Sequence, residues 1–206
     1  MPHDPLLHRL IGALWGAWAL YWLATAPGNK PARRRESWRS RLAYSAPVFA
    51  GALLIVWRPA PRGGWLAAPL SLAAPLWPGS PLSGWIGLAL LAAGLALAVW
   101  ARVHLGRNWS GTVTVKEGHE LIRTGPYARV RHPIYTGLLG AVLGTAVIAG
   151  SVRAALGFAI IAAALVIKSR IEERYLCETF PGEYPRYRAT VPALLPFTGP
   201  RRSAPR

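Results

Sequence analysis

The stretch IYTGLLGAVLGTAVIAGSVRAALGFAIIAAALVI, residues 134–167, decides the fold of this chain. It is apolar except for a break at Gly150, Ser151 and Arg153. Because a helix needs roughly 20 predominantly apolar residues to cross a bilayer, the stretch predicts two short spans joined by a tight turn. Apolar stretches at 10–26, 42–57 and 82–101 precede it. The sequence therefore predicts five transmembrane helices that end in a helical hairpin.

The composition agrees with this interpretation. Of the 206 residues, 52% are hydrophobic and only 16% are charged, which is unlike an ordinary soluble domain or a disordered chain. A single cysteine excludes an intrachain disulfide framework. Six prolines between 58 and 81 predict an interfacial loop. Gly137, Gly140 and Gly144 share one helical face, and the spacing of Gly140 and Gly144 predicts a close approach between helices. We expect an all-α integral membrane protein, and a first stretch that is retained as an anchor.

The basic residues predict its orientation. Lys and Arg number 24 against 8 Asp and Glu, a formal net charge of +16. Six of them lie in 27–41, six in 102–133 and eight from 168 onward, which leaves four elsewhere. Loops rich in Lys and Arg stay cytoplasmic, so we expect an exterior N-terminus, a cytoplasmic C-terminus and a plasma or inner membrane location. No helix-turn-helix, zinc finger or RNA-binding signature is present, and nucleic acid is not expected as a partner.

Residues suited to chemistry gather in the loop 102–133 and in the tail after residue 168. They form short motifs with a fixed order. These are Gly118-His119-Glu120-Leu121, Gly125-Pro126-Tyr127, Arg131-His132-Pro133-Ile134-Tyr135 with Gly137, Glu172-Glu173-Arg174-Tyr175-Leu176, and Phe180, Tyr184, Tyr187 and Pro196. The third motif opens the hairpin, where the free amides of a helix N-terminus favour a carboxylate or phosphate.

Together these motifs resemble the isoprenylcysteine carboxyl methyltransferase family of integral membrane methyltransferases, over residues 105–197. The resemblance implies S-adenosylmethionine as cofactor, held at a cytoplasmic loop and tail. The implied cofactor-binding residues are His119, Glu120, Leu121, Ile122, Tyr127, His132, Pro133, Ile134, Tyr135 and Glu172. No G-x-G-x-x-G turn follows a strand pattern, so a Rossmann-type site is not expected.

The acceptor is expected to be lipophilic and to reach the site from the bilayer, with membrane lipids around the protein. If it is a carboxylate, as in isoprenylcysteine, it needs no general base. Arg131 would then be the catalytic cation, and Lys168 and Arg170 would bind the substrate. The resemblance predicts an arginine at position 168, and lysine lacks the bidentate fork of arginine. No metal is expected, since His3, His8 and His104 show no metal spacing.

Three alternatives remain open. A phospholipid N-methyltransferase would need His132 or Glu173 as a base. A nicotinamide-dependent membrane reductase would share the R-H-P-x-Y element, although Ile134 stands where such enzymes usually have Asn. A non-catalytic accessory protein would also fit the composition. The expected organisation is an N-terminal transmembrane region, 1–101, a methyltransferase-like region, 102–197, with its hairpin at 134–167, and a flexible tail, 198–206; the oligomeric state is left open.

Overall fold

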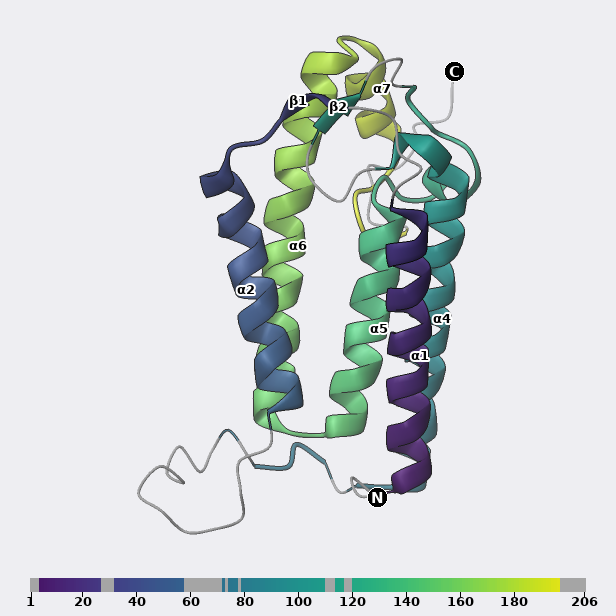
Figure 1. The fold of residues 1–206 in the computed structure, drawn as a ribbon, viewed down its shortest axis with the longest axis vertical. Helices are drawn as coiled ribbons and strands as arrows, with labels where there is room; N and C mark the ends of the chain where they lie inside the picture. The colour runs from purple at the N-terminus through teal and green to yellow at the C-terminus, as the bar shows by residue number, and fades with distance from the viewer. Residues whose placement is uncertain are drawn as a thin grey trace, which may run out of the picture.

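The structure is a computed structural model that describes residues 4–26, 32–57, 72, 74–77, 79–109, 114–116 and 120–196. Within these residues, five long helices lie side by side, and a short helix caps one end (Figure 1). Their bounds are α1 Pro5–Thr25, α2 Trp38–Val56, α4 Pro81–Leu105, α5 Pro133–Ala149, α6 Val152–Thr179 and α7 Glu183–Thr190. Every apolar stretch predicted as a span forms a helix, which confirms the helical fold.

Two of these helices, α4 and α6, are long and apolar enough to cross a membrane, and α5 is a shorter apolar helix. The count of five spans therefore remains a prediction. Helix α6 also runs well past the predicted end at residue 167, to Thr179. This extension carries the polar motif with Glu172 and Glu173 out of the apolar part of the bundle.

Local sequence explains where the helices begin. Asp4, Ser37 and Ser80 occupy the N-cap positions of α1, α2 and α4, and each side chain accepts a hydrogen bond from a backbone amide of the first turn. Such caps satisfy amides that have no partner within the helix. Helix α5 ends at Gly150, whose φ of +59° suits glycine, and Ser151 follows as the N-cap of α6. The predicted tight turn between the hairpin helices is thus confirmed.

Glycines bring the helices together in two pairs. A Cβ atom at Gly94 of α4 would lie 2.5 Å from the carbonyl oxygen of Gly137 in α5. A Cβ atom at Gly87 of α4 would lie 2.6 Å from the carbonyl oxygen of Gly144 in α5. In the second pair, a Cβ at Gly51 of α2 would lie 2.6 Å from the carbonyl oxygen of Gly157 in α6. These positions exclude any side chain, and the closest backbone approaches lie within the pairs α4/α5 and α2/α6.

The predicted close approach along the glycine face of α5 is confirmed, but Gly140 is not its tightest position. A Cβ there would make only ordinary contact, 3.5 Å from the Cα of Gly94. The tightest positions are Gly137 and Gly144, which are seven residues apart and share one face of the helix.

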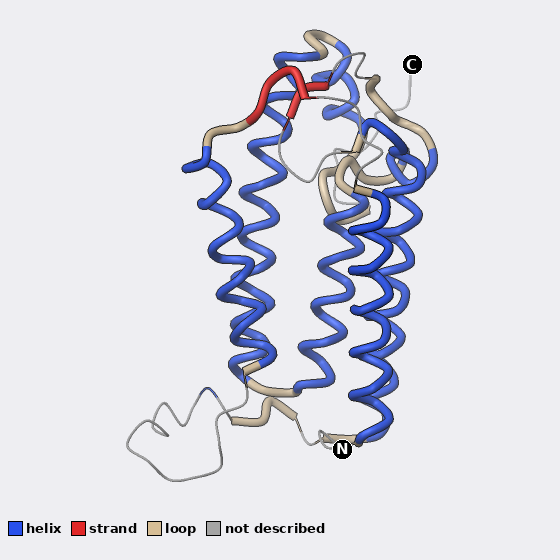
Figure 2. The backbone as a smooth tube through the Cα atoms, in the orientation of Figure 1, coloured by secondary structure: helices blue, strands red, loops and turns tan. Residues whose placement is uncertain are grey.

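A short antiparallel ribbon crosses one end of the bundle, which the sequence did not predict. Strand β1 (Ala32–Arg35) pairs with β2 (Thr114–Lys116) and joins the α1–α2 connection to the α4–α5 connection (Figure 2). At the opposite end, the segment 74–77 binds the hairpin turn: Leu76 donates to the carbonyl of Gly150, and Val152 to that of Ala74. The rest of the predicted interfacial loop lies almost entirely outside the described residues.

Candidate active site

The polar motifs meet where α5 begins and α6 extends beyond the bundle, at the end that carries the ribbon and α7 (Figure 1). The N-cap of α5 is His132, and its side chain makes no capping hydrogen bond. The imidazole instead faces the two carboxylates of α6. Nε2 lies 3.2 Å from Oε1 of Glu173, and Nδ1 lies 3.5 Å from Oε2 of Glu172. His132 and Glu173 are both buried.

Arg131 is held by protein partners on all of its nitrogens. Nε and Nη2 donate to Oε1 of Glu173 at 2.8 and 2.6 Å. Nη1 donates to the carbonyl oxygens of Arg188 and Val191. The second oxygen of Glu173 lies 3.5 Å from Nε of Arg188, which is exposed. Arg131 thus fixes both the acidic motif of α6 and the segment that follows α7.

That segment also seals the start of α5. The amides of Arg131 and His132 donate to the carbonyls of Pro192 and Ala193, at 2.9 and 3.0 Å. The Thr136 hydroxyl donates to the carbonyl of Leu194 at 2.6 Å. These bonds satisfy the amides of the N-cap and of the residue before it, and Pro133 at the first helical position has no amide to satisfy. The anion site expected at this helix start remains a prediction.

The third part of the site is aromatic and cationic. The Tyr135 hydroxyl donates to Glu172, and its ring stacks on His132 with centroids 5.5 Å apart. The Lys168 ammonium lies 5.3 Å from the centre of the Tyr135 ring and 4.9 Å from that of Tyr44, which comes from α2. Lys168 and Glu172 are one helical turn apart and therefore share a face of α6.

The charge of His132 follows from these neighbours. Burial disfavours the charged imidazolium, but the hydrogen bonds and negative charges of Glu172 and Glu173 outweigh burial and raise the pKa of His132 above its ordinary value. His132 therefore carries a proton more readily than a free histidine. A protonated imidazole donates hydrogen bonds and does not serve as a base.

The motif with Tyr127 forms a 3-10 helix, η3, over Gly125–Ala128. Tyr127 is buried in a hydrophobic cluster with Tyr135 and Ile134, and Ile122 packs against it. The Tyr187 hydroxyl of α7 donates to the Tyr127 carbonyl at 2.6 Å. The last tyrosine motif thus holds η3 beside α5.

Not every predicted site residue joins this arrangement. His119 lies outside the described residues, and Glu120 is exposed. Leu121 is half-buried, and Pro133 is buried in the first turn of α5. Arg170 is exposed, and at two positions from Lys168 it points to a different face of the helix. Geometry thus brings together Arg131, His132, Tyr135, Lys168 and Glu172, while their functional roles remain predictions.

Sequence reasoning missed two residues of α2 and its N-terminal flank. Tyr44 contacts Lys168, and its hydroxyl donates to Glu36, which is buried. The sequence held one signal for them: a carboxylate, Glu36, just before the apolar stretch 42–57, and a tyrosine, Tyr44, near its start. Polar groups in such a place often mark function.

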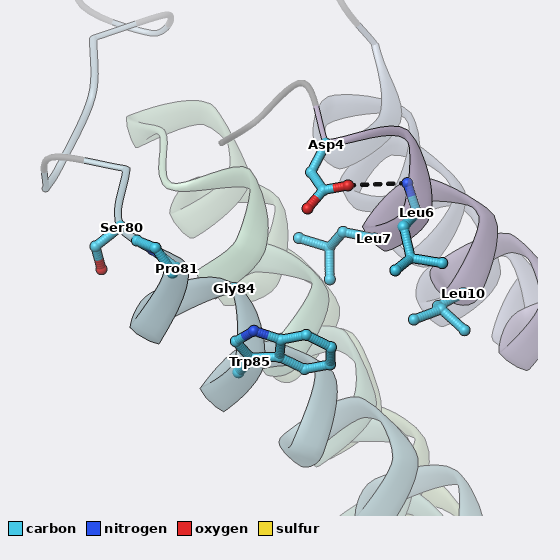
Figure 3. A pocket seen from close by; sticks show the side chains of 8 residues that line it. All are labelled: Asp4, Leu6, Leu7, Leu10, Ser80, Pro81, Gly84 and Trp85. Carbon is cyan, nitrogen blue, oxygen red and sulfur yellow. Dashed lines mark hydrogen bonds between the residues drawn. The ribbon is translucent and has the colours of Figure 1, made fainter.

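A pocket lies at the other end of the bundle, between the starts of α1 and α4 (Figure 3). Leu7, Gly84 and Trp85 are among the residues that line it. The carboxylate of Asp4 at its edge already accepts a hydrogen bond from the Leu6 amide at 2.9 Å. The predicted site residues lie at the opposite end, so this pocket is not the candidate active site.

Apolar helices packed through glycine, two of them long enough to cross a membrane, carry a buried ionic cluster at one end. Residues 85–178 match the isoprenylcysteine carboxyl methyltransferase (ICMT) family. The resemblance predicted from the motifs is therefore confirmed for this part of the chain.

Similar proteins include one named as an isoprenylcysteine methyltransferase and one named as a metal-resistance protein. Over 127 residues the chain is 32% identical to "Protein-S-isoprenylcysteine O-methyltransferase B" of Arabidopsis thaliana, covering 58% of this chain and 64% of that protein. It is also 34% identical over 117 residues to "Nickel-cobalt-cadmium resistance protein NccN" of Alcaligenes xylosoxydans xylosoxydans, covering 54% and 52%. The match thus spans about half to two-thirds of the length of these relatives.

The fold has a solved counterpart in the eukaryotic intramembrane Ras methyltransferase ICMT. The TM-score is 0.56 at 20% identity, and the match covers 95% of this chain and 69% of that chain. The helical arrangement is therefore shared across nearly the whole chain, α1 and α2 included. The family match together with the apolar helices supports an integral membrane protein.

Proposed function

We propose that this protein is an S-adenosylmethionine-dependent membrane methyltransferase that acts on the carboxylate of a lipophilic, isoprenylcysteine-like acceptor at the cytoplasmic face. The observation that carries the proposal is the cluster of Arg131, His132, Tyr135, Glu172 and Glu173, assembled within the family-matched region. The basic regions 27–41, 102–133 and 168–206 favour the cytoplasmic side, because regions rich in Lys and Arg stay cytoplasmic.

The residues present fit the proposed cofactor. S-adenosylmethionine carries an ammonium group, ribose hydroxyls, an aromatic base and a sulfonium centre, which supplies an activated methyl group. Glu172 is a carboxylate suited to the ammonium group or to hydroxyls, and it is already oriented by Tyr135 and His132. The rings of Tyr135 and Tyr127 belong to the same buried cluster and suit an aromatic or cationic ligand group.

Lys168 is the cation that we assign to the acceptor. Arg131 was expected to be catalytic, but its guanidinium is engaged by Glu173 and two carbonyl oxygens. We propose that Arg131 holds Glu173 in place, and that the ammonium of Lys168 attracts the acceptor carboxylate. A carboxylate is already an anion at neutral pH, so alignment beside a donor and exclusion of water are the main tasks of the protein.

The amine alternative is weaker on these grounds. Methylation of an ammonium group requires a base, and two carboxylates raise the pKa of His132, which favours its charged form over the neutral form that could act as a base. Glu173 has its oxygens engaged by Arg131, His132 and Arg188. A carboxylate acceptor needs neither residue to take a proton.

The test is methyl transfer by the purified protein in lipid nanodiscs. Radiolabelled S-adenosylmethionine is offered with a farnesylated cysteine derivative, and in parallel with phosphatidylethanolamine. Base-labile radiolabel on the farnesylated compound, dependent on Lys168, is the expected result. Label found only on the ethanolamine lipid would replace the proposal with N-methylation, and no cofactor binding at all would favour a non-catalytic membrane protein.

A further inference from the structure

Tyr44 reaches the site from a part of the chain that the family match leaves out. The matched region is 85–178, whereas Tyr44 belongs to α2. Its ring centre lies 4.9 Å from the Lys168 ammonium, and the Tyr135 ring lies 5.3 Å from the same group. An ammonium within about 6 Å of an aromatic face is attracted by the ring electrons. Two rings from different helices therefore hold one lysine.

The Tyr44 ring is itself fixed. It is only 6% exposed, and its hydroxyl donates to the Glu36 carboxylate. The same carboxylate accepts from the Ser40 hydroxyl at 3.0 Å. Further along α2, Gly51 lies against Gly157 of α6, so the two helices cannot separate without loss of that close contact. Tyr44 thus presents its ring to Lys168 from a rigid support.

Such support matters for a lysine. Its side chain is long and flexible, and part of its rotamer entropy is lost when the ammonium binds a ligand. A side chain that is already restrained loses less on binding. Restraint of the Lys168 side chain also fixes the position of its ammonium relative to the Glu172 carboxylate, because Lys168 and Glu172 share a face of α6.

We propose that Tyr44 is a positioning residue for the methyl acceptor: with Tyr135 it holds the Lys168 ammonium where it meets the acceptor carboxylate. This rests on the proposed function, since it assigns Lys168 to the acceptor. Tyr44 acts through Lys168 and not through the cofactor. Helix α2 thereby becomes part of acceptor recognition, while cofactor residues come from α5, α6 and the loop between α4 and α5.

The kinetic test compares Tyr44→Leu, which removes the ring, with Tyr44→Phe, which retains it. Tyr44→Leu should raise the acceptor KM about fivefold or more and leave the cofactor Kd unchanged, whereas Tyr44→Phe, which keeps the ring but loses the hydrogen bond to Glu36, should raise the acceptor KM clearly less. In a Lys168→Ala background, Tyr44→Leu should add nothing further. Tyr44→Met takes the place of Tyr44→Leu if the leucine variant does not purify.

A second readout does not depend on catalysis. Lys30 and Lys116 are changed to arginine, which leaves Lys168 as the single lysine, and it is labelled by reductive ¹³C-methylation. Ring currents should shift its NMR signal upfield in the wild-type and Tyr44→Phe backgrounds but less in Tyr44→Leu.

The outcomes separate the two proposals. An active enzyme with an unchanged acceptor KM in Tyr44→Leu, a KM effect that persists without Lys168, or an NMR shift insensitive to the ring would overturn the role of Tyr44 alone. Absence of methyl transfer by the wild type to every carboxylate acceptor, with the NMR shift intact, would overturn the proposed function, and with it the role of Tyr44 in acceptor binding.

Discussion

Arg131 and Glu173 form an ion pair in which two guanidinium nitrogens donate to one carboxylate oxygen, at 2.8 and 2.6 Å. The two side chains are 9% and 8% exposed. Removal of one partner from a buried pair leaves an uncompensated charge and costs about 3 to 5 kcal/mol. Because the pair joins the start of α5 to α6, its removal tests whether this contact stabilises the candidate site.

Arg131→Ala should strongly lower the thermal stability of the detergent-purified protein, because Glu173 and two carbonyl oxygens lose their donor. Arg129→Ala, at an exposed position two residues earlier, is the matched control and should change stability little. Tryptophan fluorescence or differential scanning fluorimetry measures both. Equal melting temperatures for the two variants would contradict a structural role for the pair.

His132 should make stability depend on pH. Its pKa is raised in the folded protein, so its contribution is fully present below the unfolded value of about 6.5 and is lost as the pH rises through the folded pKa. The melting-temperature difference between the wild type and His132→Gln should be largest near pH 6 and shrink above neutrality. A difference that grows with pH would mean that His132 is buried in its neutral form.

Glu172→Gln should weaken S-adenosylmethionine binding by about ten- to a hundredfold, since a hydrogen bond to a charged group contributes about 1.5 to 3 kcal/mol. The amide can still accept a hydrogen bond from Tyr135. Arg170→Ala, on the same helix but exposed, serves as the control. Equilibrium dialysis with labelled cofactor provides the affinities, and unchanged binding by Glu172→Gln would remove this carboxylate from the proposed cofactor site.

Gly137→Ala should impair assembly of the bundle, because its Cβ would lie 2.5 Å from the Gly94 carbonyl oxygen and 2.6 Å from the Ala98 amide. Forced overpacking of this kind costs about 1 to 3 kcal/mol or more. Gly140→Ala, on the same helix with only ordinary contacts, should be tolerated. Size-exclusion profiles and melting curves of the two variants should differ clearly, and similar behaviour would refute the assigned glycine contacts.

Orientation can be tested with reporter fusions. Fusions after Arg41, Glu117 and Arg206 should report the cytoplasm, and a fusion near Gly64 should report the opposite side, because basic residues concentrate in the first three regions. A C-terminal fusion found outside would overturn both the five-span topology and the cytoplasmic location proposed for the site.

The helices could be predicted because a membrane-spanning helix must be apolar over a minimum length, and that requirement is written in consecutive residues. The end of α6 could not be located in this way. Beyond residue 167 the helix continues to Thr179 with polar residues, which carry no hydropathy signal. The ribbon was missed for a related reason: Arg33, Arg34 and Arg35 were interpreted only as cytoplasmic charges, although they lie in or beside paired strands.

Part of the site could also be predicted, because its motifs lie close together in sequence around the hairpin. The contacts that each side chain makes within it could not be predicted. Arg131 has the residue type of a substrate clamp, and only the structure shows that Glu173 and two carbonyls already engage it. Tyr44 is distant from Lys168 in sequence, and no local pattern joins them.

The glycine contacts have a genetic consequence. The tightest backbone contacts lie inside the pairs α4/α5 and α2/α6, while the candidate site lies on the seam where α5 of one pair meets α6 of the other. Substitutions of Gly87, Gly94, Gly51 or Gly157 should therefore impair folding and strongly lower the abundance of the protein in the cell. Changes at Tyr135, Lys168 or Glu172 should leave the protein abundant but inactive. A saturation screen that scores abundance and activity separately would therefore identify the residues between α5 and α6 from sequence variants alone.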